Sequence, residues 1–229
     1  MIFNDRTIFT LNNSLAAISA VKRNEAITAT DGQSRQILVF NADGVQTDCV
    51  SATRAYRRLR HINDIGYSAL SCCESPDVYM LDSGFNEIAR VTLDIPCDCA
   101  KSGINGISDA ELILRGGEIF ITAAFAKGAY LFNKSGERLS RLCKADCGEM
   151  LTDFITLGED SYAFATLCKG AQTVSVSENG CVYSGVLPRK YVLRMLFCEN
   201  AKVYGLFGRN YLYNHIIPIY VNGILLLPQ

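Results

Sequence analysis

The chain has 229 residues, of which 49% are hydrophobic, and its formal net charge at pH 7 is −1. This near-neutral balance provides no basic field over a wide surface, so nucleic acid is not expected as a partner. No stretch of the sequence is both long and apolar enough to cross a bilayer as a helix, so no membrane partner is expected either.

The sequence contains ten cysteines, and its first residues carry mixed charges with no apolar segment of the kind found in secretory signals. The cysteines are therefore expected to be reduced and to act as small hydrophobic residues. Together these features predict a cytoplasmic location.

Along the chain, the pattern of residues predicts short strands and no long helix. An initial strand is expected at Thr7 to Leu11. Five units of four strands then follow within a single domain, at about 14–50, 51–93, 107–142, 148–187 and 188–229. The longest irregular stretch, residues 94–106, separates the second unit from the third.

Each unit contains a tight turn between two apolar, strand-forming runs. The turn glycines are spaced about 40 to 52 residues apart and are Gly44, Gly84, Gly136, Gly180 and Gly223. Each follows Asp, Ser or Asn, and Asn-Gly and Asp-Gly suit hairpin turns because both residues accept positive φ at little cost. A second run of strand-forming residues follows every turn.

Before each turn lies a short run that combines a small residue with an aromatic or aliphatic one. These runs are Ala26–Ala29, Gly66–Ala69, Phe120–Ala123, Ala163–Thr166 and Val203–Leu206. Small residues allow neighbouring sheets to approach closely. A period of 40 to 50 residues with four strands per unit is typical of a β-propeller blade, which must stack on its neighbours to bury both faces.

The predicted fold is therefore all-β, a five-bladed β-propeller of four-stranded antiparallel blades. A β-sandwich with generic hairpins, and a six-bladed or irregular ring, remain alternatives. Both ends of the chain carry apolar runs, Thr7 to Leu11 and Ile224 to Leu227. Because an open ring would leave strand edges unpaired, we expect these two runs to lie in the same sheet.

Five repeats with a strand, an Asn/Asp-x-Gly turn and a second strand resemble the general class of WD40-like and NHL-like propellers. In length and number of blades the chain is also similar to tachylectin-like five-bladed lectins. The Gly-His and Trp-Asp signatures of WD40 repeats are absent, and the chain contains no tryptophan. The resemblance therefore concerns architecture, and no functional residue is carried over from it.

Charged residues collect in the segments expected to form the innermost strands, which would line a central channel. Basic residues come from the first, second and fifth units, and acidic residues from the third and fourth. The candidate ligand-binding residues are Arg57, Arg58, Arg60, Arg194, Asp109, Glu111 and Asp153. Arginine forks could hold a small anionic ligand there, or these charges could be solvated or paired with one another.

The second unit carries the densest basic run. Strand alternation would place Arg58 and Arg60 on one face of the strand and Arg57 on the other. An arginine buried between blades would need a carboxylate partner. Arg54, Arg189 and Lys190 are expected on inner strands as well.

Cysteines and carboxylates provide the remaining chemical possibilities. Cys97 and Cys99 precede the third unit, while Cys143 and Cys147 follow it. The spacing departs from that of known zinc fingers, so no metal and no cofactor are predicted. Neither His61 nor His215 belongs to a recognisable catalytic motif.

These observations favour a non-catalytic binding or interaction scaffold whose partner is a protein or a small anionic ligand. The alternative is a small hydrolase or lyase with carboxylates at the mouth of the channel. Lectin activity is a further possibility that the lack of tryptophan disfavours.

Overall fold

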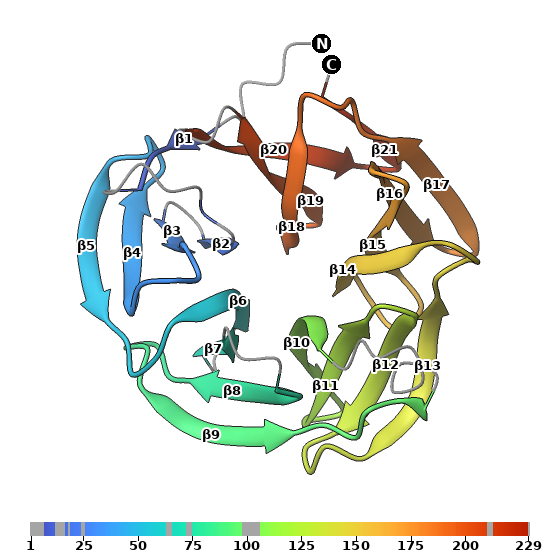
Figure 1. Cartoon of the computed structure of the whole chain (residues 1–229), viewed down its shortest axis with the longest axis horizontal. Helices are drawn as coiled ribbons and strands as arrows, with labels where there is room; N and C mark the ends of the chain where they lie inside the picture. The colour runs from blue at the N-terminus through green and yellow to red at the C-terminus, as the bar shows by residue number, and fades with distance from the viewer. Residues whose placement is uncertain are drawn as a thin grey trace.

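The computed structural model of the chain describes residues 7–11, 17, 19–23, 26–62, 66–71, 75–97, 106–209 and 213–228. Its strands form five antiparallel sheets. Four are meanders of four consecutive strands, and in the fifth a meander of three consecutive strands is joined by the first and last strands of the chain. The sheets stand around a central axis in chain order, with the first strand of each meander nearest the axis (Figure 1). The chain is thus an all-β five-bladed propeller, as predicted.

The blades are bounded as follows. The first consists of β2 (Ser19–Arg23), β3 (Ala26–Thr30), β4 (Gln36–Asn41) and β5 (Gln46–Ser51). The second consists of β6 (Tyr56–Ile62), β7 (Gly66–Ser71), β8 (Asp77–Leu81) and β9 (Glu87–Thr92). The third consists of β10 (Ile107–Arg115), β11 (Glu118–Phe125), β12 (Gly128–Asn133) and β13 (Arg138–Lys144). The fourth consists of β14 (Met150–Thr156), β15 (Tyr162–Cys168), β16 (Ala171–Glu178) and β17 (Cys181–Val186). The fifth consists of β18 (Val192–Glu199), β19 (Lys202–Arg209) and β20 (Tyr213–Val221), completed by β1 (Thr7–Phe9) and β21 (Ile224–Leu225).

The two termini close the ring together. β1 pairs with β20 from Asn214 to Ile216, and β21 pairs with the same strand at Tyr220 and Val221. The outer strand of the fifth blade is therefore assembled from β1 and β21, which pair with different parts of β20 (Figure 1). The prediction that the two apolar terminal runs share one sheet is confirmed.

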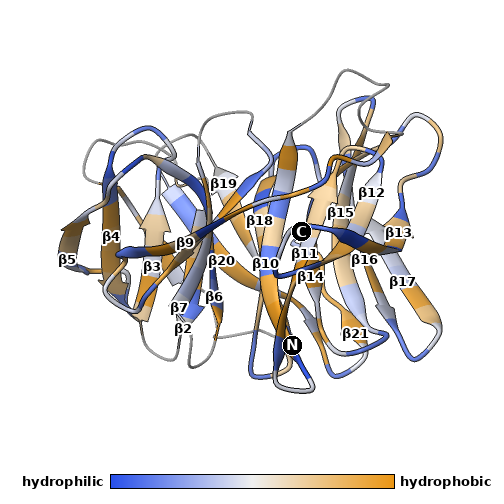
Figure 2. Cartoon of the chain, turned by 90° about the horizontal axis from the view of Figure 1, so that it is seen from below, coloured by the Kyte–Doolittle hydropathy of each residue, from blue (hydrophilic) through white to orange (hydrophobic). Residues whose placement is uncertain are grey.

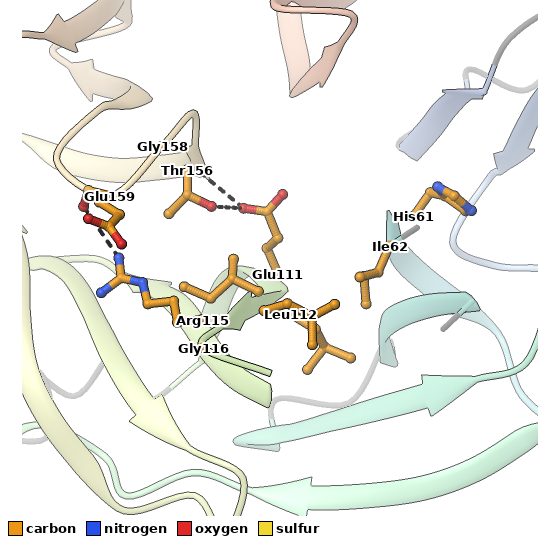
Figure 3. Close-up of a pocket in the computed structure, with 11 residues that line it drawn as sticks. His61, Ile62, Glu111, Leu112, Arg115, Gly116, Thr156, Gly158 and Glu159 are labelled. Atoms are coloured by element: carbon orange, nitrogen blue, oxygen red, sulfur yellow. Dashed lines mark hydrogen bonds between the residues drawn. The ribbon is translucent and has the colours of Figure 1, made fainter. Parts of the chain in front are cut away.

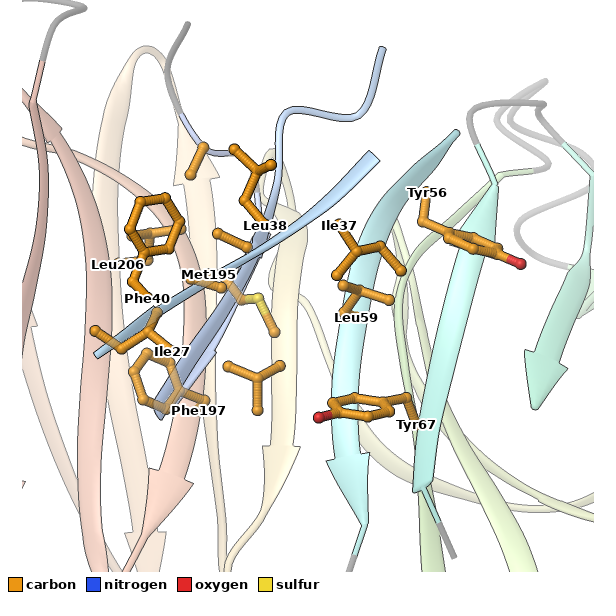
Figure 4. Packing of buried hydrophobic residues seen from close by; sticks show 14 of the residues in the cluster. Ile27, Ile37, Leu38, Phe40, Tyr56, Leu59, Tyr67, Met195, Phe197 and Leu206 are labelled. Carbon is orange, nitrogen blue, oxygen red and sulfur yellow. The ribbon is translucent and has the colours of Figure 1, made fainter. Parts of the chain in front are cut away.

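The hydrophobic core lies between blades. One cluster of buried side chains joins the fifth, first and second blades, with Met195, Ile37 and Leu59 among its members (Figure 4). Three further clusters join the remaining neighbours. The colouring of Figure 2 shows hydrophilic residues mostly in the turns at the two faces. Each blade buries its apolar side chains against the next, so the chain needs a complete ring to form its core.

The small residues predicted to allow close packing lie on the second strand of each blade. Ala29, Ala69, Ala123 and Ala165 are fully buried there. In the fifth blade the corresponding strand carries Gly205, where an added Cβ would come within 3.0 Å of a methyl group of Leu193 and closer still to the ring of Phe207. At Gly205 the space is taken by side chains of its own blade, because Leu193 lies on β18 and Phe207 on β19.

Each of the five turn glycines lies between the third and fourth strands of its blade, but the turns are of two kinds. In the fourth and fifth blades, Asn-Gly adopts positive φ at both positions, as expected. In the first three blades a side chain at the end of the third strand, or directly after it, accepts two backbone N–H groups of the turn; these acceptors are Asn41, Asp82 and Asn133. Asp43 does not have positive φ, and in the second blade Phe85 has it instead of Gly84. The expected geometry was therefore wrong for these two turns, because a side-chain acceptor closes a longer loop.

The outer strands are the most exposed part of each blade. β5, β9 and β13 all carry charged side chains, whereas β17 carries none. β17 pairs only with β16 among the described strands. Its edge is therefore open and uncharged.

No helix within the described residues is long and apolar enough to cross a membrane. The seven described cysteines are all free. Cys72, Cys73 and Cys99 lie outside the described residues.

Candidate functional site

The inner strands carry a repeated irregularity at the same level of the ring. In β6, β10, β14 and β18 the pairing register with the second strand shifts by one residue, which leaves Arg57, Ser108, Thr152 and Arg194 as bulged positions. A bulge redirects the side chains that follow it. The residues directly after the bulges are Arg58, Asp109, Asp153 and Met195.

Side chains at this level replace a missing strand partner. Each inner strand has one edge without a neighbouring strand, and its backbone groups need other partners. Asp109 accepts a hydrogen bond from the N–H of Phe154 at 3.3 Å, and Asp153 accepts one from the N–H of Leu196 at 2.7 Å. In the first blade, Ser19 accepts one from the N–H of Leu59 at 2.8 Å. In all three cases a blade satisfies the inner strand of the next blade.

The centre of this network is a buried arginine. Arg60 donates to both carboxylate oxygens of Asp109, to Asp153 Oδ1 at 2.5 Å, and to the backbone carbonyl of Leu196. The exposed fractions of the three charged side chains are 3%, 0% and 2%. The group connects four of the five blades, and the carboxylate partner expected for a buried arginine is confirmed.

The buried cation lies between two carboxyl groups whose pKa values shift in opposite directions. Burial acts to raise the pKa of Asp109, but the charges of Arg60 and Arg58, together with hydrogen bonds to Asp153 and Arg60, outweigh it and lower this pKa to about 2. Burial and the negative charge of Asp109 raise the pKa of Asp153 well above its usual range. The pKa values of the two carboxyl groups are therefore shifted in opposite directions, beside the guanidinium of Arg60 and that of Arg58, which lies 4.0 Å from Asp109.

Arg57 and Arg58 lie toward the face of the ring that carries the connections between blades. Arg57 donates to the carbonyls of Ser71, Ser108 and Ile107, and Arg58 to those of Ser108 and Arg194. The prediction that Arg57 points away from Arg58 was wrong, because the bulge interrupts alternation and both side chains reach the carbonyl of Ser108. Arg194, the bulged residue of β18, packs over Gly208.

Glu111 extends the same pattern toward the opposite face. Its Oε2 accepts hydrogen bonds from Thr156, at 3.0 Å from the backbone N and 2.7 Å from Oγ1. Burial raises the pKa of Glu111, although Arg60 and Thr156 oppose this effect. Figure 3 shows this carboxyl group at the side of an open pocket of about 470 Å³ that His61 and Arg115 also line.

The structure brings all seven candidate residues to the inner strands. It does not bring Arg54, Arg189 and Lys190 there. Arg54 precedes β6 and forms a bidentate ion pair with Glu87 on an outer strand, at 2.5 and 2.9 Å. Arg189 and Lys190 lie in the connection between β17 and β18. These three expectations were wrong because the residues lie just outside the strands to which the sequence pattern assigned them.

Sequence reasoning missed Ser19 and Thr156, which complete the network with hydroxyl groups. Nothing in their local sequence distinguishes them from surface residues, because their role depends on the neighbouring blade. Within the described part of the chain, no group of three or more His, Cys, Asp or Glu residues is arranged to hold a metal ion.

The arrangement is suited to holding blades together, since its charged donors and acceptors engage one another or the backbone. Glu111 is the member of this group that is best placed to act as an acid or base, since its pKa is raised and it lines an open pocket.

No protein-family description matches the sequence, and no curated protein is significantly similar to it. Solved structures show similarity of fold. The chain is similar to virginiamycin B lyase from Staphylococcus aureus with a TM-score of 0.53 and 8% identity over 94% of this chain and 99% of that one. It is similar to the WD40 domain of Neurospora crassa Pan2 with a TM-score of 0.45 and 11% identity, over 97% of this chain and 64% of that one. For Hsv2 of Kluyveromyces lactis the TM-score is 0.43 at 10% identity, over 84% of this chain and 57% of that one. The chain thus spans less than two thirds of the two WD40-type structures, and at these identities the similarity concerns the propeller fold alone.

Proposed function

We propose that this protein is a non-catalytic interaction scaffold that binds a partner protein through the outer side of its fourth blade. The proposal agrees with the propeller fold, whose rigid ring presents turns and outer strands to the surroundings. It is also supported by the inner strands, where charged side chains are engaged in joining the blades.

The observation that carries the proposal is the open edge of β17. Its six residues include no charge, and Val182 and Val186 are each 63% exposed. Soluble proteins usually protect such edges with charged side chains, because an open edge pairs readily with another strand. Addition of an extended segment to a free edge is a common mode of protein recognition. The exposed, uncharged edge of β17 is therefore the surface on which we place the partner.

The proposal is tested with a lysine on this strand. Val182→Lys should abolish capture of at least one protein that the wild type captures from its source cells, as quantified by mass spectrometry. The matched control is Leu139→Lys on β13, an outer strand that is already charged and where Leu139 is 52% exposed. If all three proteins capture the same set, with unchanged thermal stability, the proposal is wrong.

A small anionic ligand is a further candidate partner, on the side of the axis where Arg57, Arg58 and Arg194 gather. The donors of Arg57 and Arg58 bond backbone carbonyls, which favours the protein partner over the anion. We also propose a cytoplasmic location, supported by the seven free cysteines.

The second candidate function is that of a small hydrolase or lyase, and one observation favours it. Glu111 has a raised pKa and lines an open pocket, as a general acid would. Such an enzyme would lose its turnover of glycoside or ester substrates in Glu111→Gln, whereas a scaffold would retain its binding. Turnover that is the same in this variant as in the wild type would exclude Glu111 as the acid.

A further inference from the structure

A groove separates the fourth and fifth blades on the face opposite the pocket of Glu111. The β15–β16 turn forms one wall, and the connection between β17 and β18 forms the other. Its volume is about 810 Å³. Because turns alternate between the two faces along a meander, this groove and the Glu111 pocket open in opposite directions.

The floor of the groove is held in place by polar contacts between the two blades. The side-chain amide of Gln172 donates to the carbonyl of Leu193 at 2.9 Å and accepts from the N–H of the same residue at 2.9 Å. The backbone carbonyl of Gln172 also accepts the N–H of Leu187 at 2.8 Å. Tyr191 is buried beside the groove, with its ring edge-on to Phe207 at 5.8 Å between centroids. A floor built in this way keeps its shape without a ligand, which lowers the entropic cost of binding.

The walls combine exposed apolar and basic side chains. Val186 and Val192 line the groove and are 63% and 50% exposed. Lys169 and Arg189 line it from the two walls, and neither forms an ion pair with another described residue. Lys190, next in the chain, stands 5.6 Å from the ring centre of Tyr191. No acidic side chain is among the described residues that line the groove.

This local excess of positive charge contrasts with the chain as a whole, whose formal net charge is −1. Positive groups on both sides of an apolar groove complement a ligand that is apolar along its length and negative on its flanks. Two or three cations form too small a patch for the phosphate backbone of a nucleic acid, which several phosphate contacts must hold.

We propose that this groove binds an extended acidic segment of a partner protein, with apolar side chains against Val186 and Val192 and carboxylates beside Lys169 and Arg189. The inference rests on the proposed scaffold function and adds to it the chemistry of the partner. Val186 ends β17 and also lines the groove, so one partner can use both surfaces.

The test uses the whole protein and a fluorescein-labelled peptide in which leucine alternates with aspartate. Fluorescence anisotropy should show binding that weakens with added salt, because exposed charges are screened. The double variant Lys169→Glu/Arg189→Glu should bind the peptide at least about ten-fold more weakly, since two attractive contacts become repulsive. The matched control, Lys134→Glu, reverses an exposed charge in the β12–β13 turn on the opposite face and should bind as the wild type does.

The inference is overturned if the double variant binds the peptide as tightly as the wild type, or if a leucine–lysine peptide binds equally well. It is also overturned if a single-stranded oligonucleotide or vesicles of anionic lipid displace the peptide, because the groove would then serve another class of ligand. If the acidic peptide does not bind but partner capture still depends on Val182, the groove inference fails while the scaffold function stands. If Val182→Lys captures the same proteins as the wild type, the scaffold proposal fails, whether or not the acidic peptide binds.

Discussion

Replacing Arg60 by methionine tests whether the charged inner strands serve to hold the ring together. Methionine retains much of the length of the side chain but removes the cation, its donors to Asp109 and Asp153, and its bond to the carbonyl of Leu196. The pKa of Asp153 is raised, whereas that of Asp109 is lowered, so Asp109 is the more strongly ionised of the two carboxyl groups. The substitution therefore removes the nearest cation of the buried Asp109 carboxylate and leaves it only the longer contact with Arg58, at 4.0 Å.

Two routes lead to a similar magnitude. Removing one partner of a buried ion pair costs about 3–5 kcal/mol. If Asp109 instead takes up a proton, reaching that state at pH 7 from a normal carboxyl pKa costs about 4 kcal/mol. We therefore expect Arg60→Met to lower the free energy of unfolding by about 3–5 kcal/mol at neutral pH. The cost should fall by about 1.4 kcal/mol for each unit of pH between 7 and 5, because the proton becomes easier to bind.

The assay is urea unfolding followed by far-UV circular dichroism, since the chain has no tryptophan. The control is Arg90→Met, which removes an arginine that is 61% exposed from the buried Asp77. Asp77 keeps hydrogen bonds from Ser75 and Thr92, so this change should cost at most about 1 kcal/mol. The triple variant Arg60→Met/Asp109→Asn/Asp153→Asn should regain part of the lost stability. A cost of Arg60→Met below about 1 kcal/mol, or a cost that does not change with pH, would refute the assignment of Arg60 as the buried cation that joins the blades.

Three further outcomes are expected. Asp153 has a raised pKa, so its protonated form stabilises the fold at low pH, and this contribution is lost as pH rises above about 4. In Asp153→Asn the free energy of unfolding should therefore decline less between pH 4 and 7 than in the wild type. An equal decline would contradict the raised pKa. Gly136→Ala should destabilise the protein by more than Gly180→Ala in urea unfolding. Both glycines have positive φ, but only at Gly136 would the added Cβ overlap a backbone carbonyl, that of Thr92. Equal costs would mean that the backbone near Thr92 moves to make space. Deleting residues 1–11 removes β1 and leaves part of the β20 edge unpaired, so size-exclusion chromatography should show larger assemblies, and a stable monomer would contradict this role of β1.

The number of blades could be predicted because each blade repeats the same local sequence features. A turn residue, a strand-forming run and a small residue on the second strand act within about 50 residues, where backbone preferences and side-chain size decide the outcome. The closure of the ring could also be predicted, because an open ring would leave strand edges unpaired and both termini carry strand-forming runs that can join one sheet.

The details of the site could not be predicted in the same way. Alternation along β6 misplaced Arg57 because one bulge changes the direction of its side chain. Arg54 and Arg189 resembled inner-strand residues in sequence, although one meets an outer strand and the other a connection. Each of these errors is a displacement of one or a few residues, which a pattern of strands cannot resolve.

By itself, the sequence determined that this protein folds as five antiparallel blades, since turns and strand propensity are local properties of the chain. Only the tertiary structure decided what its charges do. Arg60 lies 49 residues from Asp109 and 93 from Asp153, and these groups meet because three blades converge on one axis. Burial there changes the energy of each charge and makes each partner necessary. The packing of the fourth blade against the fifth likewise brings Lys169 and Arg189 to the lining of one groove.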